Sequence, residues 1–91
     1  MLQTVVIKVF GEVQGVFYRQ RTKENAIQIG IRGYVKNLPD GSVEIVATGT
    51  AKQLDQLTNW CWRGSDQSIV TSVVCSELPL QQFEGFIIQR L

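Results

Sequence analysis

The fold is decided by residues 31–48, which have the sequence IRGYVKNLPDGSVEIVAT. Residues 31–38 are typical of a strand, and alternate side chains of residues 42–48 are apolar, as in a strand with one buried face. Between them, residues 38–41 (Leu-Pro-Asp-Gly) favour a tight turn, because proline fixes φ and glycine accepts a positive φ. This stretch therefore predicts a β-hairpin.

One helix is predicted before the hairpin in the sequence, and another is predicted after it. Residues 4–12 alternate as a strand, and apolar or small residues at helical spacing then run from Tyr18 to Ile29, before Gly30. After the hairpin, residues 50–53 (Thr-Ala-Lys-Gln) fit a capping box that begins a second helix, which Gly64 is expected to end.

Two more strands complete the chain. Residues 69–75 form a β-branched run, Pro79 and its polar neighbours mark a turn, and residues 83–90 predict a last strand. The order is β-α-β-β-α-β with a short extra strand, which is the order of the ferredoxin-like α/β sandwich. We therefore expect an α+β fold in a single domain, residues 1–91, with two helices on one face of an antiparallel sheet.

Composition excludes several classes of protein. The net charge of +1 argues against a nucleic acid partner, because proteins that bind DNA or RNA usually carry a strong basic excess. The N-terminus lacks the features of a signal peptide, and no apolar run approaches the roughly 18 residues that span a membrane. We expect a cytoplasmic monomer. Cys61 and Cys75 are expected as reduced thiols, with a disulfide between helix and strand as the alternative.

Much catalytic chemistry is absent from the sequence. There is no histidine, so the commonest general base and every Ser-His or Cys-His arrangement are missing. Six residues after the cysteines stand Gln67 and Gln81 rather than arginine, which rules out a cysteine-dependent phosphatase loop. No phosphate-binding loop of the GxxxxGK[ST] type is present, and no close pair of aspartates is available to hold a metal.

The stretch from Val13 to Arg19 (VQGVFYR) predicts an anion site. It lies between a strand and a helix, where free backbone N–H groups and the helix dipole attract phosphate. Arg19 supplies a planar fork for two phosphate oxygens, and it is the one cation that this motif positions. Arginine in the first turn opposes the dipole, so an anion would compensate; a solvated arginine is the alternative.

Asn37 is the second candidate. It lies at the end of a predicted strand, and its amide both donates and accepts, which suits a residue that holds a water molecule. The alternative is that Asn37 only opens the turn before Pro39.

Two segments resemble the signatures of the acylphosphatase family: residues 11–22, GEVQGVFYRQRT, and residues 33–49, GYVKNLPDGSVEIVATG. The resemblance covers essentially the whole chain. It implies a hydrolase that cleaves the carboxyl–phosphate bond of small acylphosphates without a metal or cofactor. It also implies that a loop cradles the phosphate, Arg19 binds it and Asn37 orients the attacking water; the cradle residues are Gln14, Gly15, Val16, Phe17, Tyr18 and Arg19. Inorganic phosphate or sulfate is expected to inhibit.

Some residues depart from the family pattern. Ser65 stands where the family often has proline, in a loop expected to lie away from both signatures, and Trp62 is unusual. Trp60 and Trp62 are expected to pack at the sheet edge, or else to contact a partner. The alternative function is a non-catalytic anion-binding or regulatory ferredoxin-like module, which phosphate release from benzoyl phosphate would distinguish.

Overall fold

A computed structural model describes residues 1–90 and contains five strands and two helices in that range. In chain order the elements are β1 (Gln3–Glu12), α1 (Tyr18–Ile29), β2 (Arg32–Asn37), β3 (Val43–Gly49), α2 (Ala51–Arg63), β4 (Ile69–Leu78) and β5 (Phe86–Ile88). This is the predicted order, and the α+β ferredoxin-like fold is confirmed.

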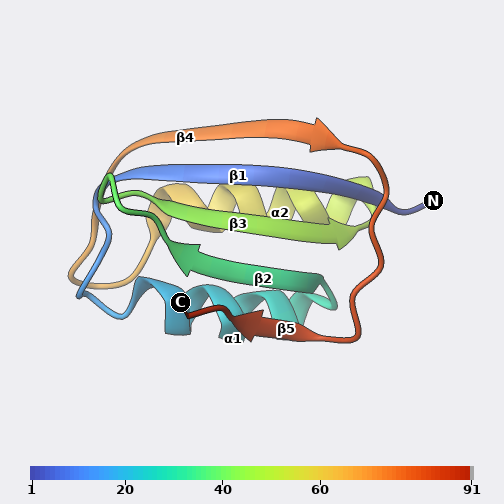
Figure 1. Cartoon of the computed structure of the whole chain (residues 1–91), viewed down its shortest axis with the longest axis horizontal. Helices are drawn as coiled ribbons and strands as arrows, with labels where there is room; N and C mark the ends of the chain where they lie inside the picture. Colours follow the sequence, from blue (N-terminus) through green and yellow to red (C-terminus); the bar gives the residue numbers. More distant parts are fainter. Residues whose placement is uncertain (91) are drawn as a thin grey trace.

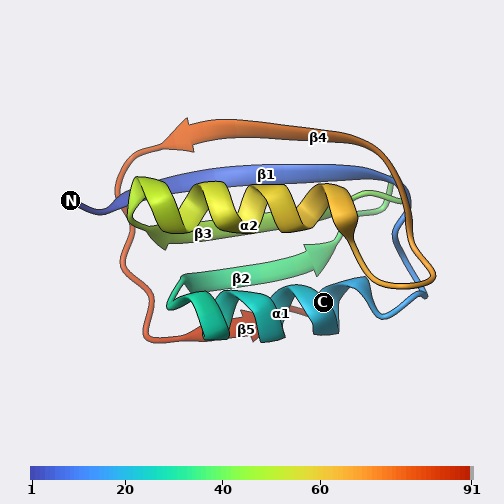
Figure 2. The same ribbon diagram turned by 180° about the vertical axis from the view of Figure 1, so that it is seen from behind.

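One sheet, in the strand order β4-β1-β3-β2-β5, carries both helices on the same face (Figure 1). Seen from behind, α2 lies over β1 and β3, and α1 lies over β2 and β5 (Figure 2). The core is the layer between helices and sheet. Every element contributes apolar side chains to it, β4 only through the partly buried Val70 and Val73. Among the most buried core residues are Ile7, Val9, Val35, Ile45, Leu57 and Ala26.

The sheet is mixed rather than antiparallel. Strands β1, β2, β3 and β4 pair antiparallel, as expected, but β5 pairs parallel to β2, with Gly33 beside Phe86 and Val35 beside Ile88. The chain leaves β4 at one edge and crosses the end of the sheet to the opposite edge (Figure 1). It therefore returns in the direction of β2, and the prediction of a wholly antiparallel sheet is wrong.

The ends of the last two strands also differ from the prediction. β4 continues to Leu78, beyond the expected end at residue 75, because its pairing with β1 persists until Thr4 lies opposite Leu78. β5 covers only Phe86–Ile88 instead of residues 83–90, because its ladder with β2 spans three residue pairs.

The hairpin and the second helix form for the predicted local reasons. The Leu38 N–H donates to the Ser42 carbonyl at 2.9 Å, and Gly41 has a φ of 92° in the turn. Thr50 and Gln53 cap α2 reciprocally, with the Thr50 N–H donating to Gln53 Oε1 at 2.8 Å. Local sequence therefore sets both the turn and the start of α2.

The tryptophans and cysteines of α2 and β4 occupy different environments. The Trp60 ring packs against Tyr18 at the start of α1, with ring centroids 5.3 Å apart, whereas Trp62 is 52% exposed. Trp60 is therefore packed against a helix residue, and Trp62 is not packed. Both thiols are free; Cys61 is buried and Cys75 is exposed.

In residues 1–90, neither helix is both long and apolar enough to cross a membrane.

Candidate active site

Segments that are distant in sequence meet at one end of the sheet. The loop between β1 and α1, the β2–β3 turn and the loop between α2 and β4 lie at the left end of Figure 1, and β5 runs toward the same end. The topology therefore brings the two signature regions together, because the β2–β3 turn lies at the same end of the sheet as the loop between β1 and α1.

The N-terminus of α1 is left open. No side chain of the described residues caps it, in contrast to the capping box of α2. Its first turn contains no acidic residue. Phe17, the residue before the helix, has a left-handed backbone with φ 63°, and Gly15 has φ 75°. Free N–H groups at a helix start attract an anion, and strained backbone is concentrated at functional sites.

Side chains from distant segments hold the loop before α1. Gln14 Nε2 donates to the carbonyl oxygens of Leu38 and Ser42, at 2.9 and 2.8 Å, and so ties the loop to the hairpin turn. Ser65 is buried, and its Oγ donates to the Val16 carbonyl at 2.7 Å. The loop that contains Ser65 therefore contacts the first signature directly, and the expectation that it lies away from both signatures is wrong.

Tyr18 anchors the start of α1 in the core. Its ring is buried, and its hydroxyl donates to the Cys61 carbonyl at 2.8 Å. Burial, with Cys61 close by, raises the pKa of Tyr18 well above its usual value, so the phenol stays protonated. Burial likewise raises the pKa of the Cys61 thiol to about 12. Neither group is a nucleophile at neutral pH, and both serve to hold α1 against α2.

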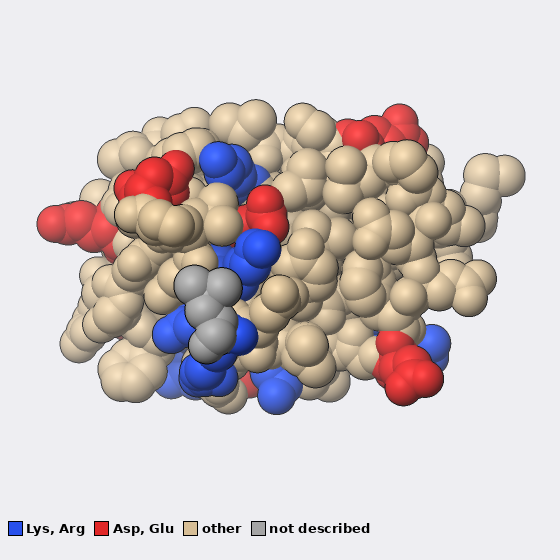
Figure 3. Space-filling view, in the orientation of Figure 1, with Lys and Arg blue, Asp and Glu red and all other residues tan. Residues whose placement is uncertain are grey.

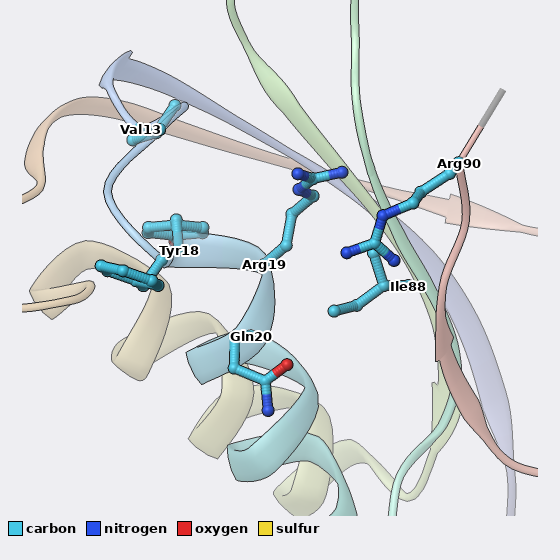
Figure 4. A pocket seen from close by; sticks show the side chains of 8 residues that line it. Val13, Tyr18, Arg19, Gln20, Ile88 and Arg90 are labelled. Carbon is cyan, nitrogen blue, oxygen red and sulfur yellow. The ribbon is translucent and has the colours of Figure 1, made fainter.

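A hollow of about 440 Å³ opens in front of the α1 N-terminus, and its wall is formed by Val13, Gly15, Phe17, Tyr18, Arg19, Gln20, Ile88 and Arg90. Arg19 extends from the first turn of α1, and Arg90 reaches in from the other side (Figure 4). The wall combines two guanidinium groups with apolar side chains, which suits a molecule with an anionic head and a carbon-rich remainder.

A smaller hollow of about 210 Å³ adjoins the first, because Arg19 and Arg90 line both; the others lining it are Lys36, Asn37 and Gln89. Asn37 Oδ1 is buried and has no hydrogen-bond partner within the described part of the chain. A buried acceptor of this kind costs free energy unless a partner such as water satisfies it.

The site carries more positive charge than the sequence motif predicts. Lysine and arginine side chains gather at this part of the surface (Figure 3), and Lys36 and Arg90 line the hollow beside Arg19. Arg19 is still the one cation of the stretch from Val13 to Arg19, and the two further cations come from outside that stretch. Arg90 lies outside both signatures, and it reaches the site only because β5 pairs with β2. No signal in the sequence pointed to that pairing.

The predicted cradle residues divide into two groups. Gly15, Phe17, Tyr18 and Arg19 line the larger hollow, whereas Gln14 and Val16 do not. The amide of Gln14 is used by the hairpin, and the Val16 carbonyl by Ser65. These two residues therefore hold the loop in place through contacts outside the larger hollow.

The fold and this site define a ferredoxin-like protein built to bind a compact anion. Comparison with known proteins identifies the family. The acylphosphatase family model matches residues 5–88. An acylphosphatase of Marinobacter nauticus is 48% identical over 79 residues, which are 86% of each chain.

Solved structures agree. The crystal structure of acylphosphatase from Bacillus subtilis has a TM-score of 0.94 at 35% identity, covering 99% of this chain and 100% of that one. An acylphosphatase from Coxiella burnetii has a TM-score of 0.93 at 34% identity, covering 97% and 93%. The chain belongs to the acylphosphatase family, and it is an enzyme that hydrolyses acylphosphates.

Proposed function

We propose that this chain cleaves the carboxyl–phosphate bond of small acylphosphates with Arg19 and Asn37 as its catalytic residues. The phosphoryl group binds at the open start of α1, where no side chain of the described residues caps the first backbone N–H groups of the helix and these groups can donate to an anion. The observation that carries the proposal is the buried Asn37 Oδ1, which has no hydrogen-bond partner among residues 1–90, in a hollow that Arg19 also lines.

The proposed reaction is a single displacement at phosphorus. A water molecule donates a hydrogen bond to Asn37 Oδ1 without giving up a proton to the enzyme, and its oxygen forms the new bond to phosphorus. The bond between phosphorus and the carboxyl oxygen breaks, and the carboxylate leaves with the electron pair. Arg19 and the backbone N–H groups stabilise negative charge on the other phosphoryl oxygens, which is the main demand of phosphoryl transfer.

The proton of the attacking water goes to a phosphoryl oxygen in this scheme. No aspartate or glutamate of residues 1–90 lines either hollow, and the chain contains no histidine. A carboxylate is a good leaving group, so it needs no acid to protonate it.

Phosphate release from benzoyl phosphate tests this function. We expect turnover that EDTA does not change, and competitive inhibition by inorganic phosphate or sulfate, because the cradle also fits these tetrahedral anions. Either anion should raise Tm, since a ligand that binds only the folded state stabilises it by mass action. Binding of phosphate without any hydrolysis would instead support the non-catalytic module.

Ser65→Ala tests whether the hydrogen bond from Ser65 to the Val16 carbonyl supports the phosphate-binding loop. Loss of the bond to the Val16 carbonyl should cost about 1 kcal/mol and lower the phosphate affinity about fivefold, because the loop is then less well held. The inhibition constant of phosphate and the thermal unfolding curve measure both effects. Ser76→Ala, at an exposed position of β4, is the control and should change neither. An unchanged inhibition constant in Ser65→Ala would limit Ser65 to a role in stability.

The cytoplasmic location and the monomeric state remain predictions from the sequence.

A further inference from the structure

The pairing of β5 with β2 brings Arg90 to the site. Val35 lies beside Ile88 in the parallel ladder, and the Gln89 N–H donates to the Val35 carbonyl at 2.8 Å, so the pairing continues past the end of β5. Residues 36 and 37 of β2 therefore lie next to residues 89 and 90. This register places Arg90 at the level of Asn37.

Arg90 faces the same space as Arg19 from the opposite wall. Figure 4 shows the two guanidinium groups turned toward the region between the first turn of α1 and the end of β5. Both residues line the larger hollow and the smaller one, so the boundary between the hollows lies between two cations. Like charges that share one space repel each other, and an anion between them removes that repulsion.

The other charges nearby differ from these two arginines. Lys36 Nζ lies 3.7 Å from Glu44 Oε2, so its charge is already compensated in part. Neither hollow has an acidic side chain from the described residues in its wall. Arg19 and Arg90 are thus the cations best placed to bind a ligand anion.

We propose that Arg90 is a second phosphate-binding residue and that the phosphoryl group sits at the junction of the two hollows, between Arg19 and Arg90. The inference rests on the proposed function, because it assigns the same reaction a further catalytic residue. The guanidinium of Arg90 donates hydrogen bonds to phosphoryl oxygens from the side opposite α1.

This placement also orders the rest of the substrate. Displacement at phosphorus requires the attacking and leaving oxygens to be roughly in line. The water lies in the smaller hollow with Asn37, so the acyl group extends into the larger hollow, where Val13, Phe17 and Ile88 offer apolar contact. The larger hollow thus receives the acyl group, which is the part that varies between acylphosphates.

Arg90→Gln tests the proposal, with Arg90→Lys and Arg32→Gln as companions. Arg90→Gln removes the charge, and we expect the inhibition constant of inorganic phosphate to rise about tenfold and kcat/KM for benzoyl phosphate to fall at least as much. Arg90→Lys should have an inhibition constant and a kcat/KM between those of Arg90→Gln and the parent, because lysine keeps the charge but lacks the planar fork of arginine. Arg32→Gln, at the exposed start of β2, should leave both values unchanged.

A purely structural role of Arg90 gives a different result. In that case Arg90→Gln lowers Tm but leaves the inhibition constant of phosphate as in the parent, and the proposal is overturned. A failure of the proposed function is seen separately: the parent protein itself would then release no phosphate from benzoyl phosphate, whatever the variants bind.

Discussion

Arg19→Ala is expected to lower kcat/KM for benzoyl phosphate by about 100- to 1,000-fold, the loss seen when a donor to a developing oxyanion is removed. Arg19 is half-buried in the first turn of α1, and its guanidinium lines both hollows. Arg90 cannot replace it, because Arg90 approaches from the opposite wall. The steady-state rate of phosphate release measures the effect, and circular dichroism establishes that the variant is folded.

Two companion variants make this test specific. Arg19→Lys should recover only part of the rate, since an ammonium group cannot contact two phosphoryl oxygens as a planar fork does. Arg32→Ala, at the other end of β2, removes a positive charge without touching the site and should retain the parent rate. Near-normal kcat/KM in Arg19→Ala would contradict the assignment of Arg19.

Asn37→Ala separates the attack of water from the binding of phosphate. We expect kcat to fall by about 100-fold or more, as for loss of a preorganised polar group, while the inhibition constant of phosphate stays close to that of the parent. The physical reason is that the buried Oδ1 of Asn37 has no partner in residues 1–90, so it is free to orient the water. Turnover and phosphate inhibition are measured on the same preparation.

Together, kcat and the inhibition constant of phosphate distinguish the possible roles of Asn37. If Asn37 only opens the turn, the change in stability is about 1 kcal/mol or less and the rate is unaffected. A large loss of both turnover and phosphate affinity would make Asn37 part of the cradle, and the water would need another holder. Asn59→Ala, at an exposed position of α2, is the matched control.

Local sequence signals predict those parts of the fold that depend on local interactions. The bounds of α1 follow from the helical spacing between Tyr18 and Ile29 and from Gly30, which has the left-handed φ of 98° typical of a helix end. The capping box of α2 and the proline-glycine turn are equally local. The direction of β5 is not, because it depends on which edge strand is left unpaired after the chain crosses the end of the sheet.

The same distinction applies to the site. Arg19 and Asn37 belong to short motifs whose chemistry can be inferred from neighbouring residues. Ser65 and Arg90 do not: Ser65 binds a carbonyl 49 residues earlier in the chain, and Arg90 lines the same hollow as Asn37 because β5 pairs with β2. A hydroxyl or a guanidinium in isolation carries no sequence signal for such a contact, so both were found only in three dimensions.

The strained, uncapped start of α1 has a consequence for attempts to engineer this enzyme. A left-handed backbone at a residue other than glycine costs about 1–2 kcal/mol, and a missing helix cap about 1 kcal/mol. Selection for heat resistance alone would therefore favour glycine at position 17 or a carboxylate at the helix start. A carboxylate there would occupy the N–H groups that the substrate needs, so of these two routes to a more stable protein the carboxylate is also a route to an inactive one.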